Sequence, residues 1–239
     1  MFASSMKVKG SGFAKLVFGL VVLGLSFVLY SHTIAATGAE DAGIRFRWAF
    51  GAMVGGGNNP KLKSITQDTV LRSGDKFKMM VELKKKCFVY VIYQNAQGEM
   101  SILFPYSLAQ FTTDYEPSRK YYIPRGDAWF QLDDHLGQET FYLLASDERL
   151  TEVEYLFNRY ETAEPTKKPE IAGQMIAEIR NIERQHRDLL AGVERPLVAG
   201  GVGRGVERAQ GQDPSDIATI STEISSADFY SKTFNIQHR

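Results

Sequence analysis

The sequence has little of several residue types on which common protein classes depend. Its 239 residues include a single cysteine, which excludes a disulfide-built scaffold and a zinc site made of several cysteines. Basic and acidic residues number 28 each, so the chain lacks the basic excess that nucleic-acid binding needs. It also lacks the Gly-x-Ser-x-Gly and His-Glu-x-x-His motifs of two hydrolase classes.

Charged and aromatic residues are distributed unevenly along the chain. The first 39 residues contain three lysines and no acid, and without those three lysines 25 basic residues remain against 28 acidic ones, a net charge of −3. Most aromatic residues lie between Phe77 and Tyr160, and none lies between positions 161 and 228. We therefore expect the dense hydrophobic core before residue 161 and a different kind of structure after it.

The N-terminal segment has the order of regions typical of a secretory signal. A basic lead, Met1–Lys15, precedes the apolar run Leu16–Tyr30, and small residues follow up to Ala39. The alternative is an uncleaved membrane anchor, because the 24 residues Leu16–Ala39 carry no charge and roughly 20 residues span a bilayer. Both interpretations place the rest of the chain outside the cytoplasm, in the periplasm or anchored to the inner membrane and facing the periplasm.

Short strands are expected in the first half of the exported part. Apolar side chains alternate with polar ones at 44–50 and 77–83, and Cys87–Tyr93 is apolar on both faces, as in a central strand. Asn95–Gly98 is a hairpin loop whose glycine suits a positive φ. Further strands are expected at 65–71, 100–104, 120–123, 128–132 and 140–145. This spacing predicts a mainly β fold, an antiparallel sandwich or barrel.

A helical segment and two further strands follow, which makes the fold α+β. Ser146 is expected to cap a helix that runs to Tyr160, and Pro169 to begin a second one. The second helix has an apolar stripe: Ile171, Met175, Ile176, Ile179, Ile182 and Leu189. The C-terminal strand pair, 217–224 and 230–237, is expected to add edge strands.

Three parts of the chain are predicted from these patterns. They are a signal peptide or anchor (1–39), a β-rich domain (40–160), and a region with the helical segment, a glycine-rich loop and the strand pair (161–239).

Candidate chemical motifs have simpler structural interpretations. Asp133, Asp134, His135 and Glu139 could form a metal cluster, but turns between strands favour such polar residues. The glycine-rich stretch 201–205 lacks the strand and helix of a dinucleotide loop. We therefore predict no metal and no cofactor.

Candidate nucleophiles, general bases and adhesion motifs are also weak. Cys87 begins an apolar strand, where a free thiol is usually buried and inert. Arg125–Asp127 matches an adhesion tripeptide but equally fits a turn. His186 lies in a charged helical stretch and His238 is next to the last residue, so we assign no catalytic residue.

A group of aromatic residues gives the most specific hypothesis for binding. If several of them emerge on one sheet face, they form a platform for a peptide or glycan. If they do not, they fill the core with their hydroxyls at its edge, which we favour because aromatic residues dominate β-cores. The group is Tyr90, Tyr93, Tyr106, Tyr121, Tyr122 and Trp129.

Five short motifs in a fixed order resemble the bacterial domain of unknown function 4384 over about residues 64–151. The motifs are Leu71-x-Ser-Gly-Asp75-x-Phe77, Phe88-Val-Tyr90-Val-Ile-Tyr-Gln-Asn-x-x-Gly98, Leu103-Phe-Pro105, Tyr122-Ile-Pro124 and Phe141-Tyr-Leu-Leu-Ala-Ser146. The resemblance implies an accessory or recognition module, since the family occurs in exported bacterial proteins and beside caspase-like or kinase domains. It transfers no catalytic residue.

These observations predict an exported bacterial envelope protein with a non-catalytic binding or assembly module. Its partner is expected to be a protein or cell-envelope component and not nucleic acid. If the N-terminal segment is uncleaved, it is expected to contact the membrane as well. Two alternatives stay open: an anchored scaffold that pairs through its helical stripe, and an envelope hydrolase that gathers His135, Asp133 or Asp134, and a serine.

Overall fold

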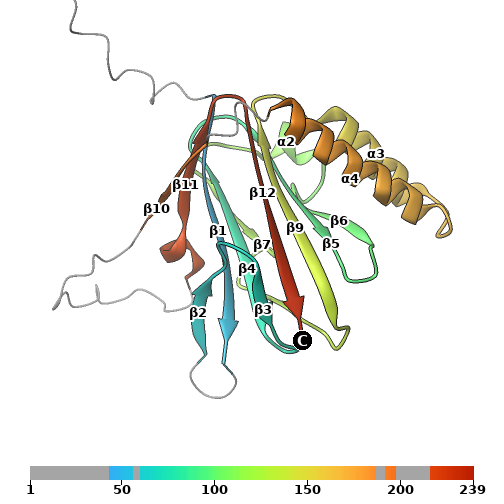
Figure 1. The fold of residues 1–239 in the computed structure, drawn as a ribbon. Coiled ribbons are helices and arrows are strands. Elements are labelled where there is room, and N and C mark those ends of the chain that lie inside the picture. The colour runs from blue at the N-terminus through green and yellow to red at the C-terminus, as the bar shows by residue number, and fades with distance from the viewer. Residues whose placement is uncertain (1–42, 56–59, 187–191, 198–215) are drawn as a thin grey trace, which may run out of the picture. The chain divides into compact units, whose positions relative to one another are not determined.

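A computed structural model describes residues 43–55, 60–186, 192–197 and 216–239. The N-terminal segment 1–39, Leu189 and the glycine-rich stretch 201–205 therefore lie outside the described residues. Ala42–Arg239 form one compact unit, built from two β-sheets and a pair of helices (Figure 1). The part boundaries expected from the sequence stay predictions.

Sheet A has seven strands. Five lie in the order β10-β11-β1-β4-β7, while β2 pairs with β1 and β8 pairs with β4. All these pairings are antiparallel. The bounds are β1 Ile44–Val54, β2 Lys61–Ser64, β4 Lys76–Leu83, β7 Lys120–Ile123, β8 Phe130–Gln131, β10 Val193–Pro196 and β11 Thr222–Ser226.

Sheet B has five strands in the order β3-β12-β9-β5-β6. Its pairings are antiparallel except for β3 and β12, which run parallel. The bounds are β3 Thr69–Leu71, β5 Phe88–Gln94, β6 Met100–Phe104, β9 Gly137–Ser146 and β12 Phe229–His238. Across the described residues the two sheets stay separate, which confirms a sandwich-like arrangement and not a closed barrel.

Alternating side chains explain how the strands build two cores. In β1 the even-numbered residues from Ile44 to Ala52 are buried between the sheets, while Arg45 and Arg47 point outward. In β5, Val89 and Val91 enter the core between the sheets, whereas Tyr90 and Ile92 enter a second core. The second face of β5 is covered by helices, which is why its sequence is apolar on both faces.

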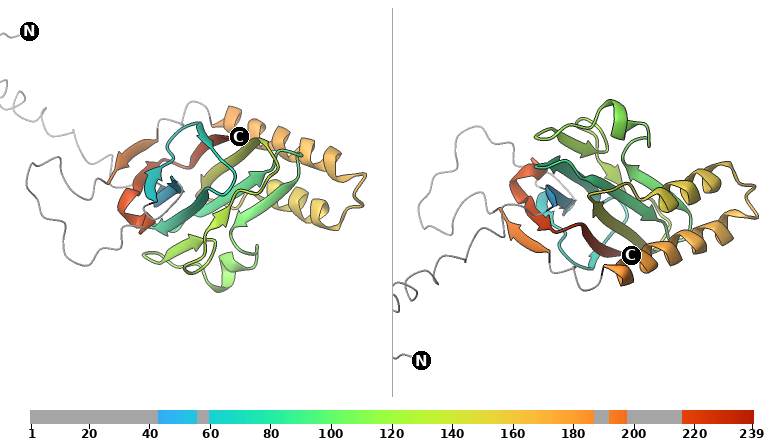
Figure 2. Two further views of the ribbon diagram at one scale, coloured as in Figure 1. Left: turned by 90° about the horizontal axis from the view of Figure 1, so that it is seen from below. Right: turned by 90° about the horizontal axis from the view of Figure 1, so that it is seen from above.

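Two helices form a hairpin on the outer face of sheet B (Figures 1 and 2). They are α3, Thr151–Thr162, and α4, Lys168–Gln185, with Pro169 in the first turn of α4. Four residues of the predicted stripe, Ile171, Met175, Ile179 and Ile182, are buried there. No helix in the described part of the chain is long and apolar enough to span a membrane.

The placement of the helices and of the last strands differs from the expectation. The helices are not a C-terminal addition, because the chain returns from them to complete both sheets. β11 lies between β10 and β1, and β12 lies between β3 and β9, so neither is an edge strand. They also do not pair with each other, since each joins a different sheet.

Several local predictions were wrong. Only Thr69–Leu71 of the expected strand 65–71 form a strand, β3, while β2 lies before this stretch. The first half of 217–224 is a 3-10 helix, η2 (Ile217–Ile220). The carboxylate of Asp216 accepts from Ala218 N–H and so favours this turn. Ser146 ends β9 and does not cap α3. The short helix α2, Gln110–Thr113, was not predicted.

Candidate functional site

Most candidates from the sequence have structural roles. Cys87 is fully buried, as predicted, and burial raises the pKa of its thiol to about 12. Arg125–Asp127 forms a turn in which Gly126 has a φ of 67° and its carbonyl accepts from Lys78 Nζ at 2.5 Å. His186 lies at the end of α4, with its Nδ1 3.5 Å from Asp228 Oδ2.

The acidic turn before β9 is not a metal cluster. Asp133 Oδ2 lies 2.8 Å from His135 Nδ1, and both side chains are exposed. Hydrogen bonds from His135 lower the pKa of Asp133. The side-chain hydrogen bond with Asp133 in turn raises the pKa of His135. Glu139, by contrast, is buried in β9. Within the described ranges no three His, Cys, Asp or Glu side chains are placed to hold a metal.

The aromatic residues do not form one platform. Tyr90 is fully buried on the helix side of sheet B, where its hydroxyl donates to Glu154 at 2.6 Å. Tyr121 is buried between the sheets, and Tyr93 and Tyr106 pack against the same core. Tyr122 lies on the outer face of sheet A. The core-filling interpretation is thus confirmed for Tyr121, whereas Tyr90 is buried in the second core, under the helices.

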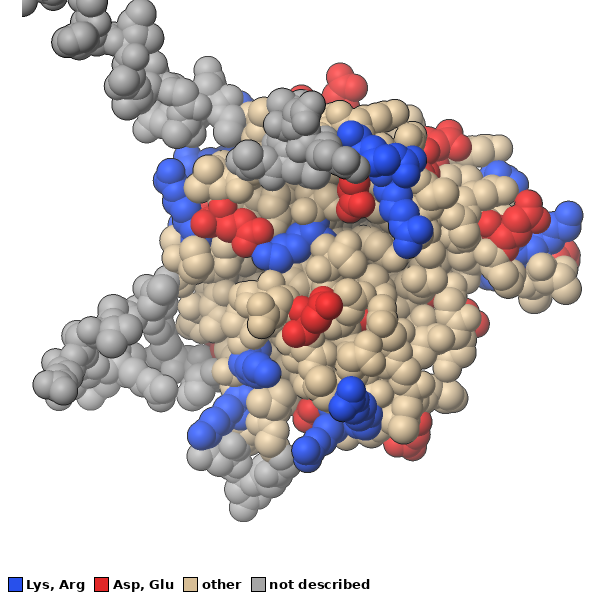
Figure 3. Space-filling model, in the orientation of Figure 1, with Lys and Arg blue, Asp and Glu red and all other residues tan. Residues whose placement is uncertain are grey.

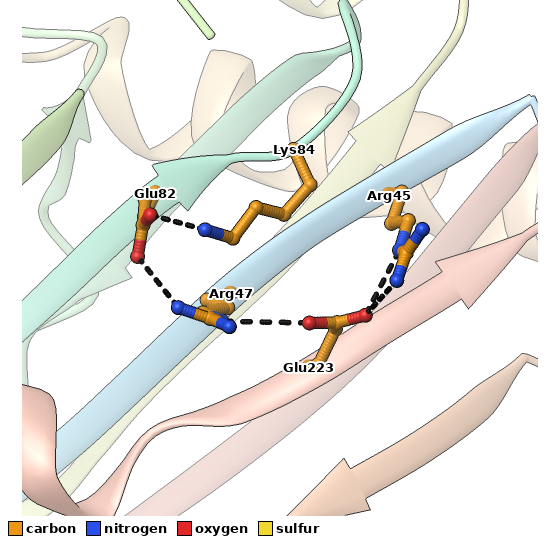
Figure 4. Close-up of polar contacts among 5 residues, drawn as sticks. All are labelled: Arg45, Arg47, Glu82, Lys84 and Glu223. Atoms are coloured by element: carbon orange, nitrogen blue, oxygen red, sulfur yellow. Dashed lines mark hydrogen bonds and ion pairs between the residues drawn. The ribbon is translucent and has the colours of Figure 1, made fainter. Parts of the chain in front are cut away.

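A row of alternating charges crosses the outer face of sheet A. Arg47 stands opposite Glu223 on one side and Glu82 on the other, at 3.4 Å from each. Arg45 and Lys84 pair with the same two carboxylates (Figure 4). Because each acid has two basic partners, both carboxylates are fully paired, and these cross-strand pairs hold the register of β11, β1 and β4.

The charges on one face of the molecule are mixed. On the face drawn in Figure 3, Lys and Arg side chains lie in separate groups with Asp and Glu between them. On this face the described residues therefore form no patch of a single charge sign.

A cavity of about 140 Å³ lies between the two sheets, beside the turn that leads into β9. Strands of both sheets contribute to it: β4 and β8 from sheet A, and β5, β6 and β9 from sheet B. An apolar hollow with a few convergent polar groups is the usual form of a small-ligand site. Its lining is Phe77, Tyr93, Leu103, Phe130, Gln131, Leu132, Asp133, Glu139 and Phe141.

Glu139 is the exceptional residue of this lining. Its side chain is only 7% exposed, yet Oε2 has no hydrogen-bond partner within the described structure. Burial raises its pKa, while a hydrogen bond from Tyr93 and the charge of His238 partly offset that rise. An unpartnered buried carboxylate oxygen is costly, so Glu139 is the residue of the lining at which a ligand contact is most expected.

Behind Glu139 the side chains continue to the protein surface. His238 is fully buried on its side-chain atoms, with Nδ1 3.8 Å from Glu139 Oε1. Its Nε2 lies 3.1 Å from the hydroxyl oxygen of the exposed Ser73. Serine, histidine and glutamate therefore stand in the order of a catalytic triad.

The surroundings of Ser73 do not favour acyl transfer. The contact between His238 and Glu139 exceeds hydrogen-bond distance. The backbone N–H groups that follow Ser73 are already used, since Gly74 donates to Leu132 and Asp75 donates to Arg72. They are thus not free to stabilise an oxyanion. Ser73 and His238 are also not among the residues that line the cavity.

Strand alternation was the signal that could have found these residues. Glu139 shares the inward face of β9 with Phe141 and Leu143, and His238 shares that of β12 with Phe234 and Ile236. Each is a polar residue at an inward-facing position, where the alternation along the strand predicts an apolar residue. Composition alone does not single them out, since His238 stands next to the last residue and Glu139 is close in sequence to an exposed acidic turn.

Comparison with known proteins identifies the segment that carries the cavity. The model of one family, described as a domain of unknown function (DUF4384), matches residues 70–149. Residues 70–149 are a DUF4384 domain. The searches of curated proteins and of solved structures found no match.

The DUF4384 domain supplies the whole lining of the cavity, from Phe77 to Phe141. Ser73 also lies inside the match, whereas His238 comes from β12, outside it. The residues after the DUF4384 domain thus supply His238, which lies behind Glu139, but none of the residues that line the cavity.

Proposed function

We propose that this protein is an exported bacterial envelope protein with a non-catalytic binding module, and that the cavity between the sheets is its binding site. One observation carries the proposal: the unpartnered, buried Oε2 of Glu139 at the wall of a cavity lined mainly by apolar side chains. A ligand that donates to this oxygen would remove the cost of leaving it unpaired.

Export is supported by the N-terminal sequence, in which a basic lead precedes an apolar run and small residues. Cell fractionation with mass spectrometry of the mature N-terminus tests this part of the proposal. We expect an extracytoplasmic protein without Met1–Lys15. An intact N-terminus would favour the membrane anchor over the cleaved signal peptide. A cytoplasmic protein would contradict export.

The scaffold alternative has less support, since the helical stripe expected to pair with another chain is packed on sheet B. The hydrolase alternative now concerns Ser73, His238 and Glu139 and not His135, although the long His238–Glu139 contact speaks against it. A fluorophosphonate probe tests it. Labelling of the wild type but not of Ser73→Ala would support a hydrolase, whereas no labelling agrees with the binding module.

A ligand-observed NMR screen of a small-fragment library against the full-length chain tests the binding site directly. Leu103→Trp should block the cavity without removing a carboxylate, because Leu103 is a partly exposed wall residue. Tyr155→Trp is the matched control, since Tyr155 is 54% exposed on α3. We expect hits that are lost in Leu103→Trp and kept in Tyr155→Trp. Hits that both variants keep, or no hits at all, would contradict the proposal.

A further inference from the structure

We infer that the cavity takes a small organic cation, an alkylammonium group. This inference rests on the proposed binding function and names the chemistry of the ligand. Three features of the lining carry it: the aromatic walls, the sign of the charged groups, and the size of the space.

The walls are largely aromatic. The ring centroids of Phe77 and Phe130 are 5.2 Å apart, those of Phe77 and Phe141 5.5 Å, and those of Tyr93 and Phe141 4.9 Å. Four rings from both sheets therefore surround one space. The faces of such rings carry partial negative charge and attract ammonium groups, most strongly where water is excluded.

The charged groups of the lining are both acidic. Glu139 lies in the wall and Asp133 also lines the cavity, and none of its lining residues is Lys or Arg. The other groups that face Glu139 are Tyr93 of β5 and His238 of β12. His238 lies on the Oε1 side, at 3.8 Å. Oε2 stays unpartnered and can accept from a ligand N–H.

The size of the cavity limits the ligand to a few heavy atoms. A protein cavity of about 150 Å³ holds benzene, and this one has about 140 Å³. A butylammonium ion matches that size, with its chain against the rings and its nitrogen at Glu139. The same group occurs in free amines and at the end of a lysine side chain.

Protein NMR titration of the full-length chain with butylammonium chloride and with 1-butanol tests the inference. The two probes share a four-carbon chain and differ in charge. We expect butylammonium to bind roughly tenfold or more tightly than 1-butanol, because a charge-assisted hydrogen bond is lost in the alcohol. Equal binding of the two probes would overturn the inference and leave the binding site in place.

Variants identify the carboxylate. Glu139→Gln should weaken butylammonium binding by roughly tenfold to a hundredfold, whereas the exposed Glu116→Gln should leave it unchanged. If Glu139→Gln does not fold, Asp133→Asn serves instead and should weaken binding a few-fold, since Asp133 is exposed and its charge is screened. Unchanged affinity in the folded variants would overturn the inference.

A further pair of probes distinguishes the two sources of the group. Lysine blocked at both backbone ends should bind more tightly than butylammonium if the natural ligand is a protein side chain. The reverse order indicates a free amine. If no cationic probe binds, the inference fails, while hits in the fragment screen that are lost in Leu103→Trp would still support the binding site.

Discussion

At the scale of single residues, polar side chains end the inward-facing rows of three neighbouring strands. Tyr93 follows Val91 in β5, Glu139 precedes Phe141 in β9, and His238 follows Ile236 in β12. β9 pairs with both other strands, which brings these side chains to one end of the core. The energetic cost of burying Glu139 makes it the most informative residue for experiment.

The stability of the protein should depend on pH through Glu139. Burial raises the pKa of Glu139 above its ordinary value of 4.5, so above that value the folded state binds more protons than the unfolded state. The free energy of unfolding therefore falls as pH rises through the raised pKa. In Glu139→Gln this contribution is absent, and the variant should gain stability relative to the wild type as pH rises.

Urea denaturation of both proteins from about pH 4 to about pH 8 measures this difference. The exposed Glu116→Gln is the control, because it removes the same charge from a solvated position. A difference between Glu139→Gln and wild type that stays constant over this range would contradict the account.

The residue types in the sequence were enough to predict the environment of some single residues. Cys87 is buried as its apolar strand suggested, and Gly98 has the positive φ, 86°, that its hairpin loop requires. The contact of His238 with Glu139 was beyond sequence reasoning because it joins residues far apart in the chain through the register of β12 and β9. The local sequence does not specify which residues of β12 and β9 stand opposite each other.

At the scale of elements, the α3–α4 hairpin is a cover for sheet B. Its apolar stripe packs on Tyr90, Ile92, Leu144 and Phe229. The helical period predicted this stripe, but it could not say whether sheet B or another chain covers it. The stretch 217–224 is ambiguous for a similar reason, since so short a pattern of apolar residues does not distinguish a strand from a helical turn.

Removing one side chain of the stripe should destabilise the fold. Met175 is fully buried, and Met175→Ala should lower the free energy of unfolding by about 2–5 kcal/mol. Arg180→Ala changes an exposed residue of the same helix and should alter it by no more than about 0.5 kcal/mol. Chemical denaturation measures both, and equal effects would show that the stripe is not packed on the sheet.

The charge row on sheet A should contribute little by comparison. Glu223 is partly accessible, and hydrogen bonding from Arg45 lowers its pKa. Glu223→Gln should lower the free energy of unfolding by about 1 kcal/mol or less. This loss of stability should be smaller in high salt, because ions screen the pair. A larger cost that persists at about 1 M NaCl would contradict a surface role.

At the scale of the whole molecule, the DUF4384 domain is only part of the folded unit. β1 lies between β11 and β4, and β12 lies between β3 and β9, yet β1, β11 and β12 are outside residues 70–149. The sequence predicted most strands but not this arrangement, because β1 pairs with a strand at the other end of the chain, Ile44 opposite Ser226.

The segment 70–149 should therefore not fold alone. Without β1 and β12 the core between the sheets lacks Phe46, Phe50 and Phe234, all buried in the full unit. We expect circular dichroism of the isolated segment to show no cooperative thermal transition, whereas the full-length chain shows one. A cooperative transition in the isolated segment would contradict this view of the fold.

The central claim is that Glu139 and the aromatic walls of the cavity bind a small cation. A crystal structure of the full-length chain with butylammonium tests it most directly. The account predicts the ligand in the cavity, with its chain against the rings of Phe77 and Phe141 and its nitrogen about 3 Å from Glu139 Oε2. An empty cavity, or a ligand whose nitrogen points away from Glu139, would contradict it.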